Sequence, residues 1–124
     1  MKDWKALQGR YLNDEVPTRL GGLAANLARI KSLTKSGVNG NAVEYLIRES
    51  KFFIEWTAMD AGMDHAAELV ELQVQLARWQ FHWSKIWADD AKRINVSEQA
   101  RVWTERVLEM SGLLSEPVAS PNQG

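Results

Sequence analysis

The 124-residue sequence contains no cysteine and only three prolines, and its formal net charge is -1. Without cysteine, disulfides, thiolate metal sites, cysteine nucleophiles and thioether-linked cofactors are excluded. The balanced charge argues against a nucleic-acid partner, because nucleic-acid-binding proteins usually carry a basic excess. No apolar run approaches the roughly 18–20 residues needed to span a bilayer, and the first residues do not resemble a signal peptide. We therefore expect a cytoplasmic protein with neither a nucleic-acid nor a membrane partner.

Apolar residues recur at steps of three and four along most of the chain, which is typical of α-helices. Five helices are expected, and they cover residues 3–12, 15 or 18 to 35, 41–61, 64–93 and 95–112. The short connections make successive long helices antiparallel neighbours. We predict an all-α fold, an antiparallel up-down four-helix bundle with a short extra N-terminal helix, in one domain of residues 1–114. Residues 115–124 contain two prolines and no apolar pattern, so we expect a flexible tail there.

The predicted helix ends rest on short local patterns. Asn41 with Glu44, and Asn95 with Glu98, have the spacing of a capping box, in which a side chain bonds the free backbone N–H groups of the first turn. Gly62 is expected to end the preceding helix in the left-handed conformation.

The predicted helices differ in their number of apolar faces. Helices 15–35 and 95–112 have one each, formed by Leu20, Leu23, Leu27 and Ile30, and by Ala100, Trp103, Val107, Met110 and Leu114. The first face of helix 41–61 consists of Val43, Leu46, Ile47, Ser50, Phe53, Ile54 and Thr57, and that of helix 64–93 of Leu69, Leu72, Leu76, Trp79, Trp83 and Ile86. Each of these two helices has a second apolar stripe, formed by Tyr45, Phe52, Trp56 and Met59, and by Ala67, Val70, Val74, Ala77, Phe81 and Ala88.

A four-helix bundle needs only one apolar face per helix, so something else must cover the second stripes. The N-terminal helix with Trp4, Leu7 and Tyr11 can cover a part of them, a second copy of the chain can pack there, or a different protein or an apolar ligand can bind. We favour a homodimer, because the N-terminal helix is too short to cover both stripes. The candidate interface residues are Tyr45, Phe52, Trp56, Met59, Val70, Val74 and Phe81.

Six tryptophans in so short a chain suggest a second kind of site. Trp79, Trp83 and Trp87 are spaced four residues apart and form an aromatic ridge. With Phe53 and Trp103 they are candidates to line a pocket for a flat apolar molecule. Packing in the core or at an interface is the competing interpretation.

No pattern points to catalysis, a metal or a cofactor. No glutamate is followed three positions later by histidine, and His65, Glu68 and Glu71 are explained as an acidic first helical turn. His82, on a polar face between Arg78 and Lys85, is expected to be a surface residue. We therefore expect a non-catalytic protein-interaction or scaffold module that acts as a homodimeric helical bundle. The alternative is a bundle that binds a small apolar ligand or pigment in a tryptophan-rich pocket.

The runs Glu49-Ser50-Lys51-Phe52-Phe53-Ile54-Glu55-Trp56 and Ala77-Arg78-Trp79-Gln80-Phe81-His82-Trp83 resemble a group of small, uncharacterised helical proteins of cyanobacteria. The resemblance covers the middle half of the chain. It implies a helical fold and assigns no activity and no functional residue.

Overall fold

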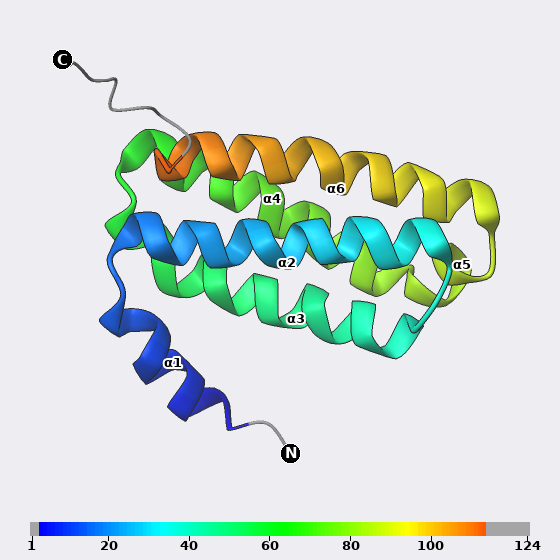
Figure 1. Cartoon of the computed structure of the whole chain (residues 1–124), viewed down its shortest axis with the longest axis horizontal. Helices are drawn as coiled ribbons and strands as arrows, with labels where there is room; N and C mark the ends of the chain where they lie inside the picture. Colours follow the sequence, from blue (N-terminus) through cyan, green and yellow to red (C-terminus); the bar gives the residue numbers. More distant parts are fainter. Residues whose placement is uncertain (1–2, 114–124) are drawn as a thin grey trace, which may run out of the picture.

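A computed structural model describes residues 3–113 and is all-helical over that range (Figure 1). The helices are α1 (Trp4–Asn13), α2 (Val16–Ser36), α3 (Gly40–Thr57), α4 (Met63–Phe81), α5 (Trp83–Trp87) and α6 (Asp90–Ser111), with a single 3₁₀ turn, η1 (Ala58–Asp60). The prediction of an all-α fold is thus confirmed for residues 3–113. The predicted tail of residues 115–124, and Leu114 before it, lie outside the described residues.

The four long helices lie beside one another, and α1 packs on the outside of α3. Helix α2 runs along both α3 and α6, and α3 also contacts α4 (Figure 1). The backbones of α4 and α6 approach each other at fewer points, while α5 lies against α6. As a consequence, the side of the molecule between α4 and α6 is the more open one.

The core consists mainly of the apolar faces that the sequence predicts, together with Tyr11, Ala24 and Val96. All four leucine and isoleucine positions expected on α2 are buried, and so is every residue of the first face of α3. On α4 and α5 the six expected core positions from Leu69 to Ile86 are buried as well. Ala100, Trp103 and Val107 of α6 complete this core, with Met110 partly buried against it. These buried faces are therefore confirmed.

The predicted long helix over residues 64–93 is wrong. Helix α4 ends at Phe81, a short α5 follows a turn at His82, and α6 begins at Asp90. The Oδ1 atom of Asp89 accepts hydrogen bonds from the backbone nitrogens of Ala91 (2.9 Å) and Lys92 (3.2 Å), so Asp89 caps α6. No proline or glycine marks these breaks in the sequence.

Both predicted capping boxes are also wrong. Helix α3 is capped by Asn39, whose Oδ1 atom accepts a hydrogen bond from Ala42 N at 3.3 Å, and Asn95 lies inside α6. Gly62 has a positive φ of 88°, but its extended ψ places it at the start of α4 and not at the end of α3. Helices α3 and α6 each begin before the position that the capping pattern suggests.

Candidate functional site

The aromatic stripe of α3 is partly covered from within the chain. The Trp4 ring lies with its centroid 5.7 Å from that of Tyr45 and 4.6 Å from that of Phe52. Tyr11 lies 5.8 Å from Trp56 by the same measure. Helix α1 thus covers part of these three positions from within the chain and leaves them half-buried, and the expectation that a second chain packs there stays a prediction.

A hydrogen-bonded junction holds α1 in this position. The Tyr11 hydroxyl donates to the backbone oxygen of Arg19 at 2.8 Å and accepts from Thr57 Oγ1 at 3.2 Å. The buried guanidinium of Arg19 donates to Trp56 O at 3.2 Å and to Asp60 Oδ2 at 3.0 Å. Burial raises the pKa of Tyr11 to about 12. The corner between α1 and α2 is thereby joined to the end of α3.

The second stripe, on α4, has no such cover in residues 3–113. The side chains of Met63, Phe81, Val70 and Val74 are 88 %, 85 %, 51 % and 47 % exposed, and Ala67 and Ala77 are exposed as well. Met59, on η1 just before this helix, is 95 % exposed. Ala88, which the sequence adds to the stripe, is separated from it by the break at His82. We call Met63, Ala67, Val70, Val74, Ala77 and Phe81 the α4 seam.

The α4 seam has two regular properties. Its residues alternate between steps of four and three, the heptad spacing of a helix that pairs with another helix. Their sizes are also symmetric about position 72, because large residues stand at both ends, alanines come next, and two valines stand at the centre. Two such seams in antiparallel orientation can therefore match each residue with one of similar or complementary size.

A groove runs beside the α4 seam, toward α6. It has a volume of about 470 Å³, and its lining includes Val70, Val74 and Trp103. The Arg106 guanidinium lies 4.1 Å from the Trp103 ring centroid and donates to Glu68 Oε2 at 2.5 Å. This groove brings two candidate interface residues together with one residue of the predicted aromatic pocket.

The other residues of the predicted aromatic pocket lie in separate places. Phe53 stacks on Tyr11 with centroids 4.1 Å apart. Trp83 and Trp87 contact each other and line a hollow of about 520 Å³ at the start of α3. Trp79 lines a different cleft, between α4 and α6. The five residues are not gathered in one cavity, because the turn at His82 directs Trp83 and Trp87 away from Trp79.

The cleft beside Trp79 is a feature that sequence reasoning missed. Its walls include a stripe of polar residues, namely Gln75, Arg78, His82, Lys85 and Asp89. The available signal was this polar stripe directly beside a buried tryptophan, followed by the basic pair Lys92-Arg93. Within residues 3–113 no three His, Cys, Asp or Glu side chains converge as metal ligands. Over the same range, none of the helices has the length and apolar character needed to cross a membrane.

Comparison of the chain with known proteins found no relative. No family model matches the chain, and neither a curated protein nor a solved structure is significantly similar to it. The resemblance to small helical proteins of cyanobacteria thus stays a prediction.

Proposed function

We propose that this chain is a non-catalytic protein-interaction or scaffold module of the cytoplasm that acts as a homodimer. In this proposal α2, α3, α4 and α6 form an antiparallel up-down four-helix bundle, and the α4 seam is its contact surface. The bundle is supported by the contacts, since each long helix touches two others. The observation that carries the proposed function is the exposed, heptad-spaced α4 seam. A contiguous apolar patch of this kind on a small protein is typical of an interaction surface.

The symmetry of the α4 seam favours a second copy of the chain as its partner. About a two-fold axis at position 72, Met63 of one copy faces Phe81 of the other, Ala67 faces Ala77, and Val70 faces Val74. The alanines allow the two helices to approach closely, and the long side chains close both ends of the contact. An unrelated partner would impose no such symmetry on the sequence of α4.

The charges beside the α4 seam support the same orientation. One flank carries Asp64, Glu71 and Arg78, spaced seven residues apart. In an antiparallel pair this flank meets its own copy, so Asp64 lies opposite Arg78. The two copies of Glu71 meet near the axis, where Arg106 Nη2, 3.6 Å from Glu71 Oε1, offsets part of the repulsion. A parallel pair would not bring the acidic and basic ends of α4 together.

Sedimentation velocity of the full chain tests the proposal. We expect a dimer at micromolar concentration, and Val70→Glu should convert it to a helical monomer because two buried carboxylates would meet near the axis. Ile94→Glu is the matched control, since Ile94 is an exposed apolar residue of α6 outside the α4 seam. A monomeric wild type, or equal loss of dimer in both variants, would overturn the proposal.

A further inference from the structure

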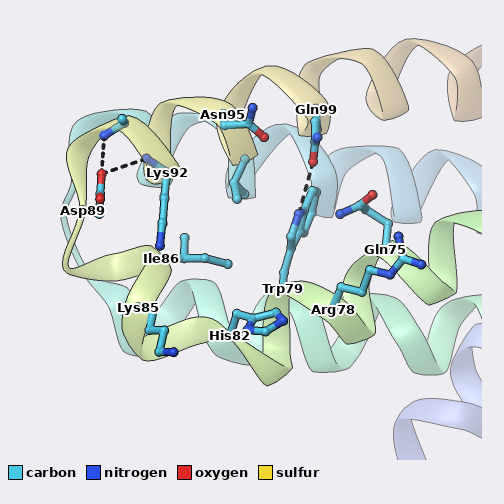
Figure 2. Close-up of a pocket in the computed structure, with 12 residues that line it drawn as sticks. Gln75, Arg78, Trp79, His82, Lys85, Ile86, Asp89, Lys92, Asn95 and Gln99 are labelled. Carbon is cyan, nitrogen blue, oxygen red and sulfur yellow. Dashed lines mark hydrogen bonds between the residues drawn. The ribbon is translucent and has the colours of Figure 1, made fainter.

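A cleft of about 530 Å³ lies between the end of α4, α5 and the first turns of α6 (Figure 2). Its floor is apolar and consists of the buried side chains of Trp79, Ile86 and Val96. The volume lies within the range of small-molecule sites, about 300–1,000 Å³. The turn at His82 and the cap at Asp89 make this cleft, because they separate α5 from a straight continuation of α4.

The rim of the cleft is cationic. Arg78, Lys85 and Lys92 line it together with His82, and none of these three cations has an ion-pair partner among residues 3–113. Lys92 extends from α6 toward Ile86 on the opposite wall (Figure 2). The whole chain carries a net charge of -1, so this local excess of positive charge is not a property of the surface as a whole.

The rim holds one carboxylate, Asp89, beside these three cations. Asp89 Oδ1 accepts from the backbone nitrogens of Ala91 and Lys92, as a helix cap does (Figure 2). Since these N–H groups are occupied, the start of α6 does not offer the free backbone donors on which a phosphate group usually binds. The side-chain cations are therefore the groups left to bind an anion.

Amide groups add hydrogen-bond donors above the apolar floor. Trp79 Nε1 donates to Gln99 Oε1 at 3.3 Å, which leaves the amide nitrogen of Gln99 as a donor at the cleft (Figure 2). Gln75 and Asn95 line the same space. An apolar floor beneath ammonium and amide donors suits a ligand with an apolar body and one acceptor group that carries a negative charge.

We propose that this cleft binds a small organic monocarboxylate with an aromatic or branched apolar body. The body lies against Trp79, Ile86 and Val96, and the carboxylate is bound by Lys92 and Lys85. Arg78 borders both the cleft and the α4 seam, so a change at Arg78 would affect both. The carboxylate site is therefore assigned to Lys85 and Lys92. The site lies within one copy of the chain and does not depend on the proposed homodimer.

Isothermal titration calorimetry of the full chain with naphthoate tests this site. We expect binding to one site with a Kd of about 1 mM or lower. Naphthylmethanol has the same apolar body without the charge and should bind at least about 10-fold more weakly. Lys92→Gln should weaken naphthoate binding by about 3–10-fold and leave naphthylmethanol unaffected. Lys5→Gln removes the same charge from an exposed position on α1 and is the matched control.

Lys85→Gln provides a second, independent variant with the same expected loss. Circular dichroism should show that both lysine variants remain folded. Equal affinity for naphthoate and naphthylmethanol, or unchanged naphthoate binding in both variants, would overturn the site. Val70→Glu should keep naphthoate binding even as a monomer, so failure of the homodimer and failure of this site are distinguishable.

Discussion

The hydroxyl of Tyr11 donates a hydrogen bond to the backbone oxygen of Arg19 at 2.8 Å, although the two residues belong to different helices. Arg19 in turn reaches Asp60 beyond the end of α3, with Nη1 3.0 Å from Oδ2. These contacts join α1, the first turn of α2 and the segment after α3 at one end of the molecule. They explain why α1 packs on α3 instead of extending into solvent.

Alkaline pH should weaken this junction. Burial raises the pKa of Tyr11 from its ordinary value of 10.0 to about 12, so the folded state disfavours the phenolate. The resulting stability is fully present below pH 10 and is lost as the pH rises through about 12, an effect of roughly 2–3 kcal/mol. Urea unfolding across this window should show a steeper loss of the free energy of unfolding in the wild type than in Tyr11→Phe. The variant is a suitable control because its lysines titrate in the same way. Parallel curves for the two proteins would contradict this.

Gly40 should resist substitution because of its contact with Trp87. A Cβ atom there would lie 2.9 Å from Trp87 Cε2 and 3.0 Å from Nε1. Gly40→Ala should therefore lower the free energy of unfolding by about 1–2 kcal/mol. Gly9→Ala is the control, because that Cβ would have open space and the helix propensity of α1 should rise by up to about 1 kcal/mol. Stabilisation by both changes would show that Trp87 does not press on the start of α3.

Removal of the Thr34 hydroxyl group should stabilise the fold. The Thr34 side chain is fully buried, and its Oγ1 atom has no hydrogen-bond partner among residues 3–113. Thr34→Val keeps the shape and should raise the free energy of unfolding by about 1 kcal/mol. Ser97→Ala should lower it by a similar amount, since Ser97 Oγ donates to Lys31 O at 2.9 Å. Thermal or urea unfolding of both variants measures the two signs.

The sequence was sufficient to predict most of the residues that form the core, although not Val96. Buried positions such as Leu23, Ile47 and Leu72 repeat with the period of a helix, because one face of each helix packs inward. This regularity is local and needs no knowledge of neighbours. The same regularity predicts the α4 seam from Ala67 to Phe81, although not Met63, and it does not show that the seam is exposed.

The break after α4 could not be predicted in the same way. Neither His82 nor Asp89 is a strong helix breaker, and the turn follows from packing that joins distant segments. Trp83 is buried, and Trp87 packs on Gly40, 47 positions earlier in the chain, with Arg93 5.5 Å from its ring centroid. Because the cleft beside Trp79 exists only through this turn, it was hidden as well. Coverage of a second stripe by α1 was one of the alternatives, but the pattern of Trp4 and Tyr11 shows an apolar face without showing which stripe it contacts.

The antiparallel pairing of two α4 seams is tested most directly by disulfide cross-linking. The chain has no cysteine, so Ala67→Cys and Ala77→Cys each introduce a single thiol on the α4 seam. Two copies of position 67 would lie about 15 Å apart along the paired helices, too far for a disulfide, whereas position 67 of one copy would lie opposite position 77 of the other. We predict disulfide-linked dimers when the two variants are mixed under mild oxidation, and little cross-linking in either variant alone. Cross-linking that is as strong in the separate variants, or absent from the mixture, would contradict this account.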